Sequence, residues 1–250
     1  MKYNIKQIDV YRDDKKIYGE FYIPEKESFP VTIFCHGLGG VYEGSIDLAQ
    51  YFASNGIGAF IFDFCGGSNN SKSDGETTEM SVLTEAADLN AVIDKLKTFD
   101  CAKKLFLVGK SQGMFVSTIV ASKRKDEIAG VVGLYSGFVL DEKVKEEAKK
   151  YDVLPETIEV LWLTVGRNYL EDIINNDIYE TMKEYSGPVL LIHGTKDEIA
   201  PLSYTKKALD YFPNAKLIVL DGADHGFHGP ERNDVIKMTY DFINEIVNKN

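Results

Sequence analysis

The sequence predicts an α/β fold in which a mostly parallel sheet carries helices on both faces. Short, continuously apolar runs recur along the chain, as expected for strands that are buried on both sides. Stretches with apolar residues at helical spacing separate most of these runs. Strands that alternate with amphipathic helices are typical of a parallel sheet with helices on its faces. Loops rich in glycine follow several of the strands, at the edge where such sheets bind their ligands.

The composition indicates one well-filled domain. The chain has 250 residues, of which 44% are hydrophobic and 12% aromatic, enough for a single large core over residues 1–250. A formal net charge of −11 repels nucleic acid and anionic membranes, so we expect neither as a partner. The first residues lack the apolar core of a signal peptide, and no run is long enough to span a membrane.

Three widely spaced cysteines, Cys35, Cys65 and Cys101, form neither a disulfide framework nor a metal-binding pattern. An odd number of thiols suits a reducing compartment, so we expect a cytoplasmic protein. The glycines after residue 36 lack the spacing of a dinucleotide-binding motif. We therefore expect no metal and no cofactor. A homodimer is compatible with these features, although the sequence does not determine the oligomeric state.

Two kinds of strand are expected. Residues 7–12 and 16–23 alternate apolar and polar side chains around a polar turn, which predicts an antiparallel hairpin. Six further strands are continuously apolar and complete an eight-stranded sheet; they cover residues 30–35, 58–63, 104–109, 128–135, 188–194 and 215–220. Helices, indicated by apolar residues along one face, are expected after Ser111 and at residues 46–55, 81–97, 203–212 and 233–247.

Residues 136–187 interrupt this alternation, and we interpret them as a small cap inserted over the carboxyl edge of the sheet. Residues 143–150 are helical in character, whereas residues 158–169 resemble a strand. This segment contains the single tryptophan, Trp162, and also Tyr169. Both are candidate substrate-binding residues, because ligand pockets are rich in aromatic side chains. Cores are equally aromatic, so Trp162 is as well explained by packing of the cap onto the body.

The segment from Gly109 to Gly113 has the pattern G-x-S-x-G between an expected strand and an expected helix. That context predicts a sharp turn with Ser111 at its tip, in a strained backbone conformation. A side chain at Gly109 or Gly113 would collide with the neighbouring strand or helix. The turn exposes the Ser111 hydroxyl and directs the first N–H groups of the helix toward it. A glycine-rich turn with an incidental serine is the alternative, and the rest of the chain decides between the two.

Four loops follow strands at the carboxyl edge of the sheet, and they bring Leu38, Ser111, Asp197 and His225 together. A serine hydroxyl is a weak nucleophile until a base such as histidine takes its proton. A carboxylate in turn orients that histidine and stabilises its charged form. The chain order Ser111, Asp197, His225 predicts a catalytic triad of the α/β-hydrolase type.

Other histidines and carboxylates compete for these roles. His228 lies three residues after His225 and is its main rival as the base. His36 and His193 stand at strand ends before glycines, where we expect each ring to satisfy local backbone groups. The remaining carboxylates, expected in structural, loop or capping roles, are Asp63, Glu198, Asp221 and Asp224.

An oxyanion hole is predicted from the same arrangement. One donor should be the backbone N–H of Gln112, the residue after the nucleophile. The other should come from the loop after Cys35, most directly the N–H of Leu38. Each donor of this kind contributes roughly 3 kcal/mol to transition-state stabilisation.

The sequence resembles α/β-hydrolases over nearly its whole length, and in particular the small bacterial esterases of the cinnamoyl/feruloyl esterase and dienelactone-hydrolase-like type. The resemblance implies hydrolysis of carboxylic esters through an acyl-enzyme on Ser111, with an aromatic acyl group such as a hydroxycinnamate under a small inserted cap. The matching pieces are residues 36–40, Asp63 with the glycine-rich loop after it, residues 109–113, residues 191–197 and residues 222–227.

Two positions depart from that esterase pattern. Lys110 stands where such esterases commonly have histidine, and Met114 stands where they have glycine. Lys110 should point away from the reacting carbonyl, and Met114 adds bulk where the helix packs on the sheet. Neither change removes a member of the triad. Both weaken the inference, from the resemblance, that this protein acts on the same specific substrate as those esterases.

We therefore expect a carboxylesterase that acts on small hydroxycinnamoyl-type or short-chain esters. A serine peptidase, amidase or thioesterase would use the same triad on a different bond. Peptidases with this fold usually carry a large accessory domain, for which we see no room in this chain. A non-hydrolytic ligand-binding protein is the third interpretation, because a fold and a motif do not prove turnover.

Overall fold

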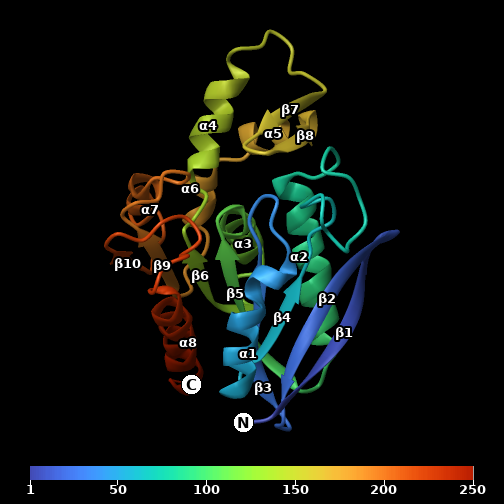
Figure 1. Cartoon of the computed structure of the whole chain (residues 1–250), viewed down its shortest axis with the longest axis vertical. Coiled ribbons are helices and arrows are strands. Elements are labelled where there is room, and N and C mark those ends of the chain that lie inside the picture. Colours follow the sequence, from blue (N-terminus) through green and yellow to red (C-terminus); the bar gives the residue numbers. More distant parts are fainter. Residues whose placement is uncertain (250) are drawn as a thin grey trace.

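One eight-stranded sheet organises the protein, in a computed structural model that describes residues 1–249. The strand order is β1-β2-β4-β3-β5-β6-β9-β10. The β1–β2 hairpin is antiparallel and β2 is antiparallel to β4, whereas the strands from β4 to β10 run parallel. The predicted sheet is thus confirmed (Figure 1). The strands are β1 Tyr3–Arg12, β2 Lys15–Pro24, β3 Phe29–Cys35, β4 Gly58–Phe62, β5 Ala102–Lys110, β6 Ile128–Leu134, β9 Val189–Gly194 and β10 Ala215–Leu220.

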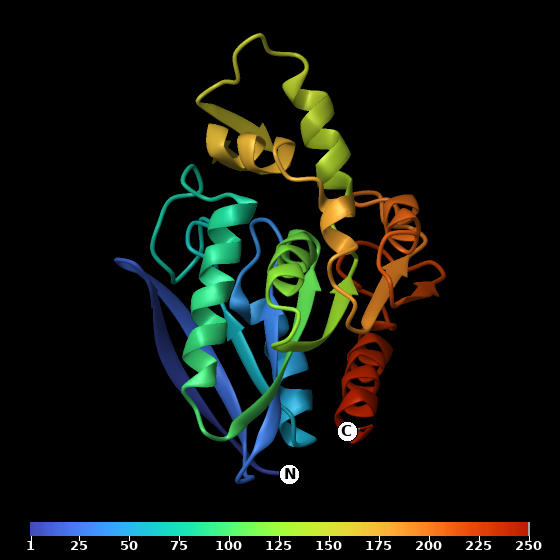
Figure 2. The same ribbon diagram turned by 180° about the vertical axis from the view of Figure 1, so that it is seen from behind.

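Helices cover both faces of the sheet (Figures 1 and 2). Successive side chains of β3 point to opposite faces, so Ile33 packs in one core with α2 and α3, and Phe34 packs in the other with α1 and α8. Both cores are closed by fully buried aromatic and aliphatic side chains. The helices of the body are α1 Ile46–Ser54, α2 Val82–Lys97, α3 Gln112–Lys123, α7 Leu202–Ala208 and α8 Arg232–Asn248, with a 3₁₀ turn at Tyr42–Ser45.

Between β6 and β9 the chain leaves the sheet and forms five short elements, of which α4, α5 and the β7–β8 hairpin lie beyond the carboxyl edge (Figures 1 and 2). The helix expected at residues 143–150 overlaps α4, but the single strand expected over residues 158–169 is wrong. Leu161 has a positive φ of 56° and turns the chain into a hairpin, and a helix begins at Arg167. The elements are α4 Val139–Ala148, β7 Thr157–Val160, β8 Leu163–Gly166, α5 Arg167–Ile174 and α6 Ile178–Met182.

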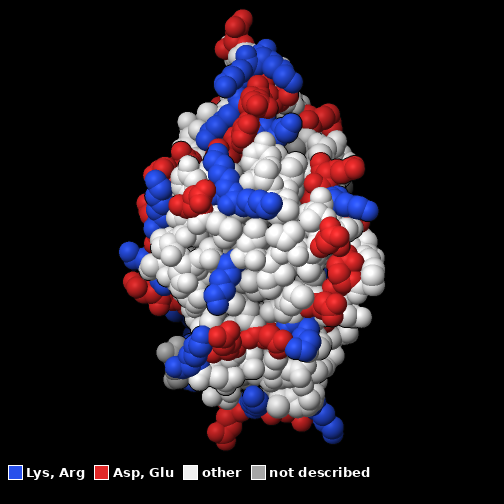
Figure 3. All heavy atoms as spheres, turned by 90° about the vertical axis from the view of Figure 1, so that its left-hand side faces the viewer, with Lys and Arg blue, Asp and Glu red and all other residues white. Residues whose placement is uncertain are grey.

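The surface carries charges of both signs. On the face drawn in Figure 3, acidic and basic side chains are interspersed and crowd most densely at the tip of the inserted segment. That face offers no continuous basic surface of the kind that binds nucleic acid. Among residues 1–249, none of the helices is both long enough and apolar enough to cross a membrane.

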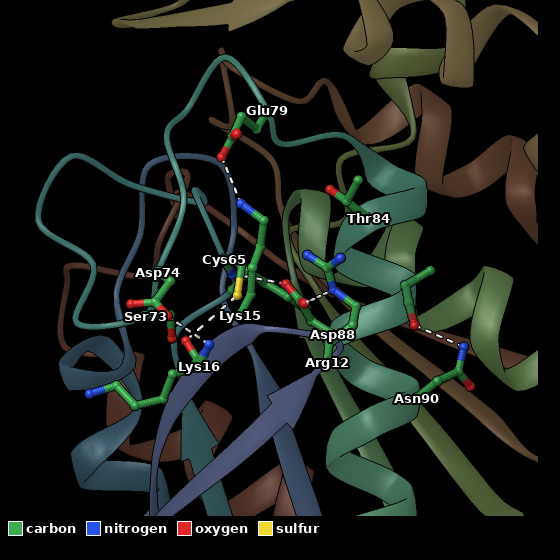
Figure 4. A network of polar contacts seen from close by, with 12 residues as sticks. Arg12, Lys15, Lys16, Cys65, Ser73, Asp74, Glu79, Thr84, Asp88 and Asn90 are labelled. Atoms are coloured by element: carbon green, nitrogen blue, oxygen red, sulfur yellow. Dashed lines mark hydrogen bonds and ion pairs between the residues drawn. The ribbon is translucent and has the colours of Figure 1, made fainter.

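A partly buried ion pair ties the N-terminal hairpin to the body (Figure 4). Arg12, at the end of β1, pairs with Asp88 of α2, whose side chain is fully buried. The second oxygen of Asp88 accepts the backbone N–H of Cys65 at 2.8 Å. Lys15 of β2 binds Glu79 at 2.7 Å in the same β4–α2 loop. Because that loop also packs against the glycine-rich loop after β3, the hairpin supports the edge of the sheet that carries the site.

We predict that Arg12→Met lowers the free energy of unfolding by about 2–4 kcal/mol, because it leaves the Asp88 carboxylate buried without its cation. Urea denaturation near neutral pH measures this loss. Adding Asp88→Asn to the Arg12→Met variant should recover a substantial part of it, since the unpaired charge is then removed. If the single variant unfolds at the same urea concentration as the wild type, the pair does not anchor the hairpin.

Candidate active site

Ser111 lies at the tip of a strained turn between β5 and α3. Its backbone has φ 50° and ψ −120°, a conformation that costs a residue with a side chain of order 1–3 kcal/mol. Hydrogen bonds hold the turn on both sides. The N–H of Ser111 donates to the carbonyl of Leu134 at 3.0 Å, and its carbonyl accepts the N–H groups of Met114 and Gly137. The neighbouring strand and loop thus fix the backbone of Ser111, and with it the position of the hydroxyl.

Both glycines of the turn are required by close backbone approach. A Cβ at Gly113 would lie 2.3 Å from the carbonyl oxygen of Cys35, at the end of β3. A Cβ at Gly109 would lie 2.4 Å from Cα of Met114 on the first turn of α3. Real Cβ atoms do not approach other atoms so closely, so the collisions expected from the sequence are confirmed.

The structure brings the three predicted triad residues together. Nε2 of His225 lies 3.2 Å from Oγ of Ser111, and Nδ1 of His225 lies 2.8 Å from Oδ2 of Asp197. Both distances are within hydrogen-bonding range, and the imidazole bridges hydroxyl and carboxylate in the way that proton transfer requires. The ring of Tyr135 packs edge-on against the His225 ring, with centroids 4.8 Å apart, and so limits its rotation.

Asp197 is buried and strongly supported. Its Oδ1 accepts the backbone N–H groups of Ala200 at 2.8 Å and Ile199 at 3.1 Å. Burial raises the pKa of this carboxyl, but hydrogen bonds from His193, His225 and the Ala200 N–H outweigh burial and hold the pKa well below its usual range. The carboxylate therefore stays ionised and oriented beside His225.

His193 does more than the sequence predicted. Its Nε2 lies 2.7 Å from the carbonyl oxygen of Ala200, which agrees with the expected local backbone contact. The same Nε2 also lies 3.0 Å from Oδ2 of Asp197, while Nδ1 lies 2.8 Å from Oγ1 of Thr205. A second histidine thus contacts the carboxylate that orients His225. The sequence signal that could have predicted this contact was the position of His193, four residues before Asp197 at the end of the preceding strand.

The rival residues lie elsewhere. His228 is exposed and contacts Asp224 at 3.2 Å rather than Ser111. His36 lies between Gly37 and the N–H of Phe64, as expected for a ring that satisfies local backbone groups, and burial lowers its pKa to about 4. The other carboxylates bind neighbouring backbone or hydroxyl groups or face solvent, and they are Asp63, Asp221 and Glu198.

The two residues predicted to supply oxyanion donors line the same pocket as Ser111. Gln112 opens α3, so its N–H has no partner within the helix. Leu38 lies in the loop after β3, where the neighbouring Gly37 approaches Ser111 so closely that a Cβ there would be 2.9 Å from Cβ of Ser111. Leu38, Ser111 and Gln112 all line the same pocket. The arrangement is compatible with the predicted pair of donors, which stays a prediction.

The Gln112 side chain is held by a buried network that the sequence did not reveal. Its Nε2 donates to Oε2 of Glu85 at 2.9 Å, and its Oε1 accepts the hydroxyl of Tyr169 at 2.8 Å. Burial raises the pKa of Glu85 to about 8, so this carboxyl is mostly protonated near neutral pH. The network connects α2, the turn at Ser111 and α5 of the inserted segment.

Neither Tyr169 nor Trp162 lines the pocket, contrary to the prediction of substrate binding. Tyr169 has no exposed surface, because its ring is in the core and its hydroxyl is bound to Gln112. Trp162 stands at the β7–β8 turn with 60% of its surface exposed. Its indole nitrogen lies against Gly39, where a Cβ would be only 2.5 Å away. The alternative assignment of Trp162, a contact between cap and body, agrees with this placement.

The pocket at Ser111 is roofed by the inserted segment. Its volume is about 300 Å³, and most of its walls are aliphatic. Leu38, Ser111 and Gln112 form the floor at the sheet edge. The aliphatic residues that surround them come mainly from the inserted segment and are Val139, Leu140, Val144, Val160, Leu161, Leu170, Ile199 and Ala200. A cavity of this size and polarity suits a small, largely apolar group.

Two family models together match most of the chain. The model described as serine aminopeptidase, S33, matches residues 26–173, and a model described as TAP-like protein matches residues 175–245. The lysophosphatidylserine lipase ABHD12 of Danio rerio is 27% identical over 200 residues, which cover 76% of this chain and 49% of the lipase. A non-heme chloroperoxidase of Kitasatospora aureofaciens is 37% identical over 51 residues, which are 18% of that protein. This chain thus spans half or less of the length of these curated relatives.

Solved structures share the fold over almost the whole chain. Est1E from Butyrivibrio proteoclasticus, determined with bound ferulic acid, has a TM-score of 0.88 at 21% identity and covers 96% of this chain and 99% of its own. A dienelactone hydrolase from Anabaena variabilis has a TM-score of 0.70 at 16% identity, with 96% and 97% covered. These likenesses show the α/β-hydrolase fold.

Lys110 is the unusual residue of the site. Its side chain is buried on the side of β5 away from the pocket, and its Nζ donates to the carbonyl of Gly44. Burial, with a smaller contribution from the neighbouring Arg232, lowers the pKa of Lys110 to about 7, although Asp47 opposes the shift. Met114, the other departure from the expected pattern, is fully buried beside Gly133 of β6 and leaves the triad geometry intact.

We predict that Lys110→Met raises the free energy of unfolding near pH 6 by about 2–4 kcal/mol. The lysine pKa of about 7 in the folded protein lies below its unfolded value of about 10.4, so the unfolded chain binds more protons across that window. The stability of the wild type therefore rises as the pH increases from about 7 toward about 10. The stability advantage of the variant should accordingly be smaller at about pH 9 than at pH 6.

Urea unfolding of both proteins in phosphate-free chloride buffers at the two pH values measures this difference. The exposed Lys206→Met variant is the matched control, because it removes an equal charge without relieving burial. An advantage of Lys110→Met that stays constant with pH would contradict the assignment of a depressed pKa.

Proposed function

The chain belongs to the family described as serine aminopeptidase, S33, and within this hydrolase family we propose that it cleaves carboxylic esters through an acyl-enzyme on Ser111. The single observation that carries the proposal is the continuous path from Ser111 through His225 to Asp197, with distances of 3.2 and 2.8 Å. Such a path removes the proton that makes a serine hydroxyl a poor nucleophile.

In the proposed reaction, Oγ of Ser111 attacks the ester carbonyl while Nε2 of His225 takes the hydroxyl proton. The ionised Asp197 stabilises the imidazolium that forms. The N–H groups of Leu38 and Gln112 bind the oxyanion of the tetrahedral intermediate. His225 then returns the proton to the departing alcohol, and water, activated by the same ring, hydrolyses the acyl-enzyme.

We propose a small aromatic acyl group, such as a hydroxycinnamate, or a short aliphatic chain as the part of the substrate that enters the roofed pocket. Its volume of about 300 Å³ and its aliphatic walls support this choice. The likeness to Est1E, whose structure contains ferulic acid, is a second support. We place the reaction in the cytoplasm, since all three cysteines lie among the described residues as free thiols.

Aminopeptidase activity is the second candidate, because the matching family carries that description and the carboxylates of Glu147 and Glu159 line the pocket. A substrate ammonium group would need such a carboxylate. Both are already engaged, since Glu147 binds Lys150 and Tyr151 and Glu159 binds Thr164. We therefore favour esters.

We predict that Ser111→Ala lowers kcat for p-nitrophenyl acetate by about 10⁴-fold or more, because the nucleophile is lost while binding is retained. The exposed Ser203→Ala variant, on α7, should retain wild-type activity and serves as the matched control. A fluorophosphonate probe should label the wild type and Ser203→Ala but not Ser111→Ala. A wild-type protein that resists the probe would exclude both the esterase and the peptidase.

A panel of five substrates tests the choice of substrate. It contains methyl ferulate, the p-nitrophenyl esters of acetate, butyrate and octanoate, and alanine p-nitroanilide. We predict that Val144→Phe, which fills part of the pocket, lowers kcat/KM for methyl ferulate by about tenfold or more and leaves acetate hydrolysis nearly unchanged. Val153→Phe, at an exposed position of the inserted segment, is the control for added bulk. Turnover of the anilide alone would replace the ester proposal by the peptidase.

A further inference from the structure

A second cavity lies behind the nucleophile turn, and the proposed reaction does not use it. Its volume is about 560 Å³, and none of its lining residues lines the roofed pocket. The two cavities are nevertheless neighbours, because residues adjacent in the chain face one or the other. Gly37 and Lys110 line the second cavity, whereas Leu38 and Ser111 line the first. At these two positions the backbone lies between the two cavities.

Two cationic side chains converge on the wall of this cavity. The ammonium group of Lys110 donates to the carbonyl of Gly44, and Nη2 of Arg232 donates to the same oxygen at 3.2 Å. Both residues line the cavity. Arg232 also holds Asp47 through two bonds of 2.8 Å, so this carboxylate is committed to the guanidinium.

The Lys110 ammonium is left with donors to spare. It has three N–H groups, and within residues 1–249 its hydrogen bond is to a single carbonyl while it forms no ion pair with a carboxylate. Asp47 attracts Lys110 from beyond ion-pair distance but is bound to Arg232, so the two cations share one carboxylate. A buried ammonium group without a direct anionic partner is costly. An anion in the adjoining cavity would supply the missing partner through charge-assisted hydrogen bonds.

The cavity also lies close to His225, the proposed catalytic base. Gly226 and Phe227, which directly follow His225, form part of its wall together with Tyr135. Tyr135 packs against the rings of both His225 and Phe227, with centroid distances of 4.8 and 5.1 Å. In the proposed reaction, His225 protonates the departing alcohol, and the cavity is lined by the two residues that follow this histidine.

We propose that this second cavity is an anion subsite, in which Lys110 and Arg232 bind a carboxylate or phosphate group. That group belongs either to the alcohol part of the substrate or to a free anion that modulates the enzyme. Both sources share the same recognition chemistry, and the experiment below distinguishes them.

The first arm measures binding and does not depend on hydrolysis. Inorganic phosphate is titrated into the wild type, Lys110→Met, Arg232→Gln and the control Lys206→Met by calorimetry in chloride buffer near pH 6.5. We expect phosphate to bind the wild type and Lys206→Met alike, and to bind Lys110→Met and Arg232→Gln weaker by about tenfold or more. Circular dichroism melting curves show whether each variant is folded. The phosphate affinity of either variant that is folded decides whether the proposal holds.

The second arm compares 4-acetoxybenzoate with phenyl acetate, which share an acyl group but differ by a carboxylate on the leaving group. If the anion belongs to the substrate, Lys110→Met should lower the kcat/KM ratio of the charged to the neutral ester by about tenfold. If phosphate binds through Lys110 and the ratio is unchanged, the subsite takes a free anion. Absence of phosphate binding to the wild type, or equal binding to the wild type and the folded variants, would overturn the proposal.

Discussion

The close approach of the Ser111 turn to the end of β3 is the constraint on which the rest of the site depends. Gly113 touches the carbonyl oxygen of Cys35 with no room for a Cβ, and this contact holds Ser111 in its strained conformation. In that conformation the hydroxyl lies 3.2 Å from Nε2 of His225, and α3 begins at the next residue, Gln112. The large parallel sheet is what makes the approach rigid, because β3 and β5 are hydrogen-bonded neighbours in its centre.

The same turn divides the space around it. Successive residues at a sharp corner face opposite sides, so Ser111 opens toward the roofed pocket while Lys110 is buried on the other side. The loop after β3 repeats this division at Leu38 and Gly37. Two cavities of different character, one aliphatic and one cationic, therefore lie on either side of a single layer of backbone.

The inserted segment contributes more than a roof. Tyr169 of α5 binds the Gln112 side chain together with the protonated Glu85, and Trp162 of the β7–β8 turn packs on Gly39. These contacts involve the side chain of Gln112, which follows Ser111, and Gly39, which follows Leu38 in the loop after β3. The inserted segment therefore contacts residues beside Ser111 as well as forming the pocket walls.

The sequence by itself determined the sheet, the turn at Ser111 and the chain order of Asp197 and His225, because these follow from local patterns: buried runs, glycines and residues placed directly after strands. The contacts of His193, Tyr169 and Trp162 were decided only by the tertiary structure. Each depends on segments far apart in the chain that meet at one edge, and a residue type carries no information about which distant group it will meet. The charge state of Lys110 is of the same kind, since only packing shows how completely an ammonium group is removed from water.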